Sequence, residues 1–269
     1  MVITFLSDYG LEDDFVGVCH AVMAGVAPDA RVVDLTHGVP RHDVRTGALV
    51  LRRALPFCPP GVHLAVVDPE VGGKRRAVAL RCAADDRILV GPDNGLLLPA
   101  AEAFGGVVAA VELGESPHRL RPVSATFHGR DLFAPVAAAL AGGAPFDDAG
   151  APVEVDDLTP LELPSARLEG EVLVAHALAI DTFGNVTLDA LHDQLSAAGL
   201  RLGAKVVVSI DGEEHDAHYA TTFADVAPGE LLLYEDAYRT LALAVNRGSA
   251  AERMAVALDD ELHLTPAAP

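Results

Sequence analysis

Two hydrophobic patterns alternate along the first 145 residues. Short apolar runs rich in Val, Ile and Leu are typical of strands, and they recur as VITFLS, RVVDLT, VHLAVVD, AVALRC, RILVG and VVAAVEL. Helical stretches separate several of these runs. In VRTGALVLRRAL, for example, Val44, Ala48 and Leu51 fall on one helical face. Strand–helix alternation of this kind predicts an α/β domain whose central, largely parallel sheet is covered by helices.

The pattern changes after residue 144. Residues 144–168 are rich in Pro and Asp and have weak periodicity, which favours a domain boundary. Farther along, strand-like runs alternate with turns, and LHDQLSAAGL is the one stretch with a helical pattern. We therefore predict an α/β domain over residues 1–155, a linker over 156–168, and a smaller β-rich barrel or sandwich over 169–269.

Composition limits the partners of the chain. A chain of 269 residues, 51% of them hydrophobic, can bury a substantial core. The net charge of −20 argues against nucleic acid or an anionic membrane as the main partner. Three well-separated cysteines without a C-x-x-C pair are predicted to be free thiols. The chain has neither a signal-peptide pattern nor an apolar run long enough to cross a bilayer, so we expect a soluble, cytoplasmic protein.

Acidic residues end three of the predicted strands. Asp8, Asp34 and Asp68 each lie at or just after an apolar run. In parallel sheets the ligand crevice lies beyond the carboxyl ends of the strands. These positions are therefore suited to a functional site.

The segment VVDPEVGGKRRAV places Asp68 and Arg75 on either side of a Gly-Gly turn. A simple strand–turn–strand connection would explain both residues. Alternatively, an Asp–Arg pair that converges across such a turn can hold a water molecule and stabilise negative charge that develops on it.

The segment SDYGLEDDFVG contains Asp8, Asp13 and Asp14. One of the last two can cap a helix that begins near Phe15. Capping does not explain three carboxylates, which together suit a ligand with vicinal hydroxyls or an ammonium group. A divalent metal is the alternative, although the spacing lacks a metal-binding pattern.

Three further turns have both a structural and a ligand-binding interpretation. Asp93 or Asn94 in GPDNGLLLP is expected to cap a helix. In the second domain, IDTFGNVTLD groups Asp181, Phe183 and Asn185, which would form either a β-turn or a pocket for a planar base. The Asn246–Arg247 turn in AVNRGSAAE has the same two interpretations.

Histidines divide into two groups. We expect most of them to be surface residues: His63, His118, His215, His218 and His263. His128 differs because TFHGRDLFAP surrounds it with polar groups at the start of a helix. P-loop, H-E-x-x-H, G-x-S-x-G and strand-following G-x-G-x-x-G motifs are absent.

Taken in order, these motifs resemble those of one family, the S-adenosyl-L-methionine (SAM) hydrolases, also called SAM hydroxide adenosyltransferases. The resemblance extends from about residue 2 to residue 256 and rests on SDYGLEDDFVG, HGVPRHDV, VVDPEVGGKRRAV, GPDNGLL, TFHGRDLFAPVAA, IDTFGNVT, TFAD and AVNRGSAAE. It implies an α/β N-terminal domain, a β-barrel-like C-terminal domain and a homotrimer with sites between subunits. It further implies hydrolysis of SAM to adenosine and L-methionine by attack of water at C5′. From the residues themselves we expect neither a cofactor nor a metal.

The resemblance also implies roles for individual residues. Asp68, Arg75 and His128 match the family's water-handling set. We hypothesise that Asp68, with His128 nearby, accepts a proton while Arg75 stabilises hydroxide-like charge. Which of Asp68 and His128 takes the proton stays open at this point.

Substrate contacts follow from the same resemblance. Asp8 matches a residue that binds the ribose hydroxyls, and Asp13 and Asp181 match carboxylates near the methionine amino group. The remaining substrate-binding positions that we predict are Asn94, Phe183, Asn185, Tyr238, Asn246 and Arg247. Ala237 departs from the family, in which a serine often holds the methionine carboxylate, and Tyr238 or a backbone amide is the candidate replacement.

Two alternatives remain. Halogenating relatives carry a tyrosine in place of Asp68, and fluorinating ones carry an extra loop after the fourth strand, where LRCAADDRILVG is short. Both departures favour water over halide as the nucleophile. The second alternative is a SAM- or adenosine-binding protein without catalytic activity.

Overall fold

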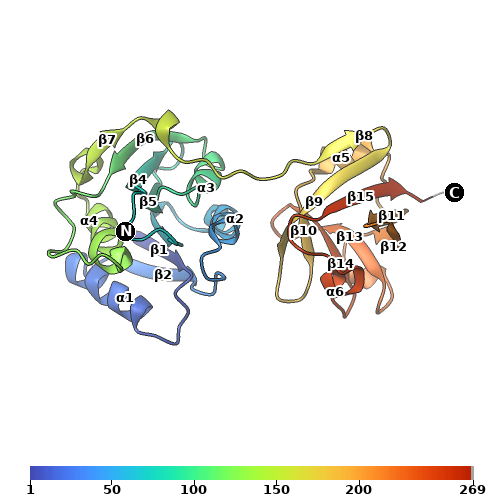
Figure 1. Ribbon diagram of the computed structural model, residues 1–269, viewed down its shortest axis with the longest axis horizontal. Helices are drawn as coiled ribbons and strands as arrows, with labels where there is room; N and C mark the ends of the chain where they lie inside the picture. The colour runs from blue at the N-terminus through green and yellow to red at the C-terminus, as the bar shows by residue number, and fades with distance from the viewer. Residues whose placement is uncertain (268–269) are drawn as a thin grey trace. The chain divides into compact units, whose positions relative to one another are not determined.

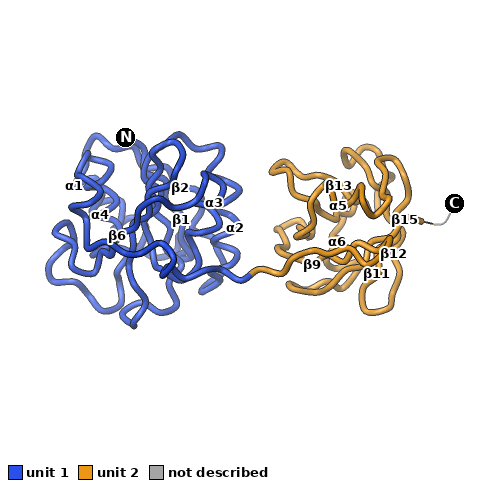
Figure 2. Tube along the Cα trace, turned by 90° about the horizontal axis from the view of Figure 1, so that it is seen from above, with its two compact units in different colours: residues 1–162 blue, residues 163–269 orange. Residues whose placement is uncertain are grey.

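The chain folds into two compact units, Met1–Glu162 and Leu163–Pro269 (Figure 2). The computed structural model describes residues 1–267. None of the helices in this part of the chain has the length and apolar character needed to span a membrane.

The N-terminal unit contains a seven-stranded sheet with the order β2-β1-β3-β5-β4-β6-β7 (Figure 1). The strands are β1 (Val2–Ser7), β2 (Arg31–Thr36), β3 (Gly61–Val66), β4 (Ala77–Cys82), β5 (Ile88–Pro92), β6 (Val107–Glu112) and β7 (Ala151–Val153). The strands β2, β1, β3 and β5 are parallel, whereas β4, β6 and β7 pair in antiparallel fashion. The predicted α/β class is confirmed, and the sheet is mixed.

Helices cover both faces of this sheet (Figure 1). They are α1 (Phe15–Val26), α2 (Val44–Ala54), α3 (Leu98–Glu102) and α4 (Ala134–Ala141), with single turns η1 (Leu55–Phe57), η2 (Gly129–Phe133), η3 (Phe146–Ala149) and η4 (Val155–Asp157). Ile3 and Phe5 of β1 pack with α1 and α4, while Leu6 packs with α2 and α3 in a second core. The period of two along a strand explains this division between the faces.

One histidine of this sheet contradicts the sequence analysis. His63 was predicted to lie at the surface, but it is 0% exposed within β3. Its Nδ1 lies 2.8 Å from Thr4 Oγ1, and Arg87 Nη1 lies 3.1 Å from its Nε2. Burial, and then the nearby Arg87 charge, lower the pKa of His63 to about 3. Both ring nitrogens of His63 therefore have a hydrogen-bond partner, as buried polar atoms generally do.

The helix cap predicted at Asp93 or Asn94 is also wrong. The helix α3 begins at Leu98, after Leu97, and has no side-chain cap. The Asp93 carboxylate instead accepts from Arg76 Nε at 2.9 Å and from the Thr159 amide at 2.8 Å. A proline within the first turn of α3 removes one of the N–H groups that a cap would satisfy.

The C-terminal unit is a closed β-barrel (Figure 1). Its strands are β8 (Arg167–Glu169), β9 (Val172–Ile180), β10 (Val186–Leu188), β11 (Lys205–Ile210), β12 (Glu213–Tyr219), β13 (Leu231–Glu235), β14 (Leu241–Val245) and β15 (Glu261–Pro266). The seven strands β9 to β15 close because β10 pairs with β9, and β8 extends β9 outside the ring. The remaining elements are α5 (His192–Ala197), α6 (Ala250–Met254) and η5 (Phe223–Asp225).

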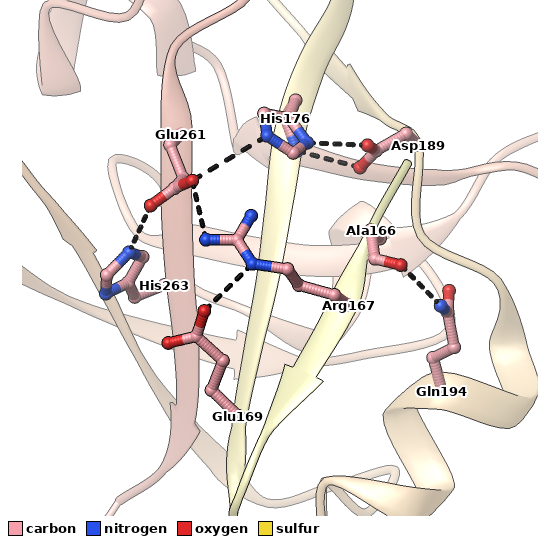
Figure 3. Close-up of polar contacts among 8 residues, drawn as sticks. All are labelled: Ala166, Arg167, Glu169, His176, Asp189, Gln194, Glu261 and His263. Carbon is pink, nitrogen blue, oxygen red and sulfur yellow. Dashed lines mark hydrogen bonds and ion pairs between the residues drawn. The ribbon is translucent and has the colours of Figure 1, made fainter. Parts of the chain in front are cut away.

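A polar network ties β8, β9 and β15 together on the barrel surface (Figure 3). Arg167 Nη2 donates to Glu261 at 2.9 Å, and His263 Nε2 lies 2.8 Å from the same carboxylate. His176 Nδ1 lies 2.7 Å from Asp189. The Arg167–Glu261 pair links β8 with β15, although a partly exposed pair of this kind contributes little stability on its own.

Candidate active site

The carboxyl ends of β1 and β3 open onto a cavity of about 350 Å³. This volume lies within the range of small-molecule sites, roughly 300–1,000 Å³. Its lining includes three carboxylates, three aromatic rings and two histidines: Asp8, Asp13, Asp68, Tyr9, Phe15, Phe127, His42 and His128. Because β1 and β3 are parallel and Ser7 pairs with Val66, the chain that follows each strand reaches the same edge of the sheet.

Asp68 and Arg75 form a buried ion pair at this edge. Arg75 Nε lies 2.9 and 3.0 Å from the two Asp68 carboxylate oxygens, and Arg75 Nη2 donates to Oδ2. The side chains are only 5% and 4% exposed, respectively. Such a bidentate contact fixes the plane of the carboxylate as well as its position. The turn between the two residues therefore does more than connect β3 with β4.

His128 joins this pair through Arg75. Arg75 Nη2 lies 2.8 Å from His128 Nδ1. A guanidinium can only donate hydrogen bonds, so Nδ1 is the acceptor and the ring proton lies on Nε2. Burial, and then the Arg75 charge, lower the pKa of His128, whereas Asp68 and Asp131 raise it. The imidazole is therefore neutral at pH 7.

Glycine allows the two segments that carry these residues to approach. Gly72 has φ +75°, and a Cβ there would overlap the carbonyl oxygen of Ala125. A Cβ at Gly129 would likewise overlap the Tyr9 hydroxyl. The Asp68–Arg75 turn thus packs directly on the backbone of the loop that leads to His128.

Asp131 holds that loop in place. It is 2% exposed, and its carboxylate accepts from the Ser124 amide at 2.7 Å and from Arg130 Nε at 2.6 Å. The Leu120 amide donates to the Asp131 carbonyl at 2.7 Å. His128 directly precedes η2, a single π-helical turn. The hydrogen bonds of the Asp131 carboxylate therefore hold the backbone next to His128 in place.

Aromatic residues, which the sequence analysis did not select, complete one wall. The ring centroids of Phe15 and Phe127 lie 5.1 Å apart, and each lies 5.9 Å from that of Tyr9. Burial raises the pKa of Tyr9 well above its usual value, so the phenol stays protonated. The sequence did contain a signal for two of these rings. Tyr9 directly follows Asp8, and Phe127 directly precedes His128.

Asp8 and Asp13 line the cavity from the chain between β1 and α1. The His42 amide donates to Asp8 Oδ2 at 2.9 Å, and the side chains of Arg41 and His42 form another part of the lining that sequence reasoning missed. Asn94 does not belong to this lining. Its amide nitrogen donates to the Val67 carbonyl at 2.9 Å, which ties the chain after β5 to the end of β3.

The other predicted substrate contacts lie in the barrel unit. Asp181 accepts from the Phe183 amide at 2.8 Å, the Asn185 amide at 3.0 Å and Asn185 Nδ2 at 2.8 Å. The β9–β10 turn is therefore held by hydrogen bonds between its own residues. It leaves the Phe183 ring 77% exposed, which is unusual for a large apolar side chain.

A second turn lies against the first. The Gly184 carbonyl accepts from the Ala251 amide at 3.0 Å at the start of α6. Asn246 Nδ2 donates to the Val226 carbonyl at 2.8 Å, and Arg247 adopts a positive φ of 62°. Tyr238 is 43% exposed in the loop between β13 and β14. The structure thus brings Asp181, Phe183 and Asn185 together, close to the segment that follows Asn246.

These observations define a class of protein: an α/β unit with a buried Asp–Arg–His cluster beside an acidic, aromatic cavity, followed by a closed β-barrel. Residues 3–150 match the SAM hydroxide adenosyltransferase N-terminal domain, and residues 175–263 match the C-terminal domain of the same family. The chain belongs to the SAM hydroxide adenosyltransferase family.

Individual relatives agree with this assignment. The chain is 52% identical to the (R)-S-adenosyl-L-methionine hydrolase of Salinispora tropica over 98% of its own length and 97% of the relative. A fluorinase of Nocardia brasiliensis is more distant, at 29% identity over 93% and 92% of the two chains. A crystal structure of an uncharacterized conserved protein from Thermotoga maritima superposes with a TM-score of 0.92, at 36% identity, and covers 98% of this chain and 99% of that one.

Proposed function

We propose that this protein hydrolyses SAM to adenosine and L-methionine by direct attack of water at C5′. The observation that carries the proposal is the buried Asp68–Arg75–His128 cluster beside the cavity. The sulfonium of SAM is a cation, and the cavity offers three carboxylates and three aromatic rings, both of which attract cations. The 52% identity to a protein named as a SAM hydrolase supports the same reaction.

The chemistry requires an aligned water and an acceptor for its proton. A bond forms between the water oxygen and C5′ while the C5′–S bond breaks, and its electron pair returns to sulfur as methionine leaves. The attacking oxygen gains positive charge as it bonds to carbon, so its proton becomes acidic and a carboxylate is a sufficient base. Holding water and C5′ in line can lower the barrier by roughly 7–11 kcal/mol at best.

Asp68 is the proton acceptor in this proposal. The Nδ1 lone pair of His128 is engaged by Arg75, and its Nε2 already carries a hydrogen. His128 therefore has no free acceptor nitrogen while that hydrogen bond persists, whereas a carboxylate keeps lone pairs beyond those that Arg75 uses. Arg75 fixes the orientation of the Asp68 carboxylate, and the Nε2–H of His128 donates a hydrogen bond to the oxygen of the attacking water.

Substrate binding involves both units. Asp8 is proposed to bind the ribose hydroxyls and Asp13 the methionine ammonium, while the exposed Phe183 ring stacks on adenine. Asp181, Asn185, Tyr238, Asn246 and Arg247 are the other proposed contacts. The reaction as written needs no cofactor, because SAM supplies the leaving group.

We further propose that the protein is a homotrimer in which the barrel of one subunit completes the cavity of the next. Mixing two impaired variants at a low SAM concentration tests this idea: Asp68→Ala lacks the proposed proton acceptor, and Phe183→Ala binds SAM more weakly. Trimers that contain both would regain some intact sites and therefore more activity than either variant alone. Activity that does not recover after subunit exchange would contradict shared sites.

The free thiols of Cys19, Cys58 and Cys82 support a reducing, cytoplasmic location.

The decisive experiment is incubation of purified protein with SAM in ¹⁸O-water that contains chloride, followed by mass spectrometry. Adenosine labelled at the 5′ oxygen, with equimolar methionine, is the expected result. 5′-Chloroadenosine would assign the halogenating reaction instead. SAM that stays bound and unchanged would favour a binding protein.

A further inference from the structure

A histidine–aspartate–histidine cluster lies outside the cavity lining, next to Ser7 at the end of β1. His20 belongs to α1, Asp34 to β2, and His37 directly follows β2. His20 Nε2 lies 2.8 Å and His37 Nε2 3.1 Å from Asp34 Oδ1, and one ligand atom from each residue lies within 4.8 Å of the others. We propose that these three side chains form a Zn²⁺ site.

The spacing of the three side chains is close to that of a zinc site. Zinc binds imidazole and carboxylate at roughly 2.0–2.2 Å, so neighbouring ligand atoms in a tetrahedral site lie about 3.3–3.5 Å apart. The two observed distances are slightly shorter, and small rotations of the partly exposed His20 and Asp34 side chains would open them. Their exposures of 36% and 39% leave the fourth position open to a water molecule.

His37 is oriented as a metal ligand is. Its Nδ1 lies 2.7 Å from the buried Ser7 hydroxyl, a contact that fixes the ring and turns Nε2 towards Asp34. Metal-binding histidines typically use the second ring nitrogen in this way. The Phe5 ring packs edge-on against His37, with centroids 4.6 Å apart, and closes the inner side of the cluster.

The Nε2 atom of His37 supplies the independent observation. The side chain is 2% exposed, and within residues 1–267 this nitrogen has no hydrogen-bond partner of acceptable geometry, although Asp34 Oδ1 is only 3.1 Å away. A buried polar atom without a partner costs stability. A cation held between this nitrogen and the carboxylate would satisfy both groups.

This site is separate from the proposed active site. None of its three residues lines the cavity, and the proposal does not depend on SAM hydrolysis. The two regions are nevertheless connected, since Ser7 directly precedes Asp8 and the His37 carbonyl accepts from the Gly10 amide at 2.8 Å. A bound zinc ion would therefore brace the segment that presents Asp8.

Calorimetric titration of the EDTA-treated, full-length protein with Zn²⁺ tests the site, and the visible spectrum of added Co²⁺ reports on ligand geometry. We expect one Zn²⁺ per chain, and loss of that binding in His20→Asn and Asp34→Asn. Ser7→Ala removes the hydroxyl behind His37 and is expected to weaken binding by roughly 10–100-fold.

His263→Asn is the matched control. His263 pairs with Glu261 at 2.8 Å, as His20 does with Asp34, but Arg167 already compensates that carboxylate (Figure 3). This variant should bind zinc as the unchanged protein does. The absence of stoichiometric zinc binding, or zinc binding that His20→Asn and Asp34→Asn leave intact, would overturn the proposal. Thermal melting in EDTA establishes that each variant is folded.

Discussion

Arg75 Nη2 donates a hydrogen bond to His128 Nδ1 at 2.8 Å while the same guanidinium holds Asp68. The relationship assigns different tasks to the three residues. Arg75 links the other two, and His128 is kept neutral with its proton on Nε2. In the proposed reaction Asp68 is therefore the group that accepts the proton.

His128→Asn should retain more activity than His128→Leu. The asparagine carbonyl can replace Nδ1 as an acceptor for Arg75, whereas leucine leaves a buried N–H without a partner. That loss costs about 1–3 kcal/mol, or roughly 5- to 150-fold in rate if all of it is felt in the transition state. Rates of adenosine formation compare the two variants. Equal losses would mean that Nε2–H, rather than the bond to Arg75, carries the role of His128.

Asp68→Asn should reduce kcat by roughly 10²–10⁴-fold, the usual contribution of a general base. The amide keeps the size of the side chain but accepts no proton, so KM should change little. Asp14→Asn is the matched control, because Asp14 lies in the same acidic segment but outside the cavity lining. Steady-state kinetics on both variants would refute the assignment if Asp68→Asn kept full turnover.

Gly72→Ala should lower activity more than stability alone explains. The added methyl group would meet the Ala125 carbonyl and push the Asp68–Arg75 turn away from the His128 loop. Gly143→Ala is the control, since Gly143 also has a positive φ, +97°, but open space around its Cβ position. It should lose about 1 kcal/mol of stability through backbone strain and keep its turnover. Urea unfolding together with kinetics separates the two effects.

The free energy of unfolding should decrease as the pH is lowered from 6.5 towards 3, because of His63. Its pKa is about 3 in the folded protein, against about 6.5 when unfolded, so the unfolded chain binds the extra proton between these values. The stabilisation is complete above pH 6.5 and decreases by about 1.4 kcal/mol for each pH unit below it. Urea unfolding of the unchanged protein and of His63→Gln measures this slope, which should be smaller in the variant. An NMR signal of His63 that titrates near pH 6.5 would contradict the prediction.

Phe183→Ala should raise KM for SAM without lowering the melting temperature. The ring is 77% exposed, so its removal costs the fold little, whereas base–aromatic stacking is worth roughly 1–3 kcal/mol. Leu202→Ala, which alters another exposed apolar side chain of the same unit, should change neither quantity. An unchanged KM in Phe183→Ala would remove this residue from the proposed adenine site.

Local pattern was enough for much of this protein. The six apolar runs of the first domain became β1 to β6, because a buried strand needs only a short sequence of β-branched and aliphatic side chains. The switch to a β-rich second half was equally readable, as was the helix at LHDQLSAAGL. Asp68, Arg75 and His128 could be selected from the sequence because each is a polar residue at the end or start of a predicted strand or helix, where ligand sites are common.

The sequence by itself determined the order of elements, the two-part organisation and the family, since each depends on residues close together along the chain. Tertiary structure decided what depends on distant contacts. His63 looked like a surface residue until pairing with Thr4 and Arg87 buried it, and His20, Asp34 and His37 met only when α1 packed beside β2. The tautomer of His128 likewise follows from Arg75, which lies 53 positions earlier in the chain. Hydrogen bonds between segments far apart in sequence leave no local pattern, because each partner alone is compatible with many environments.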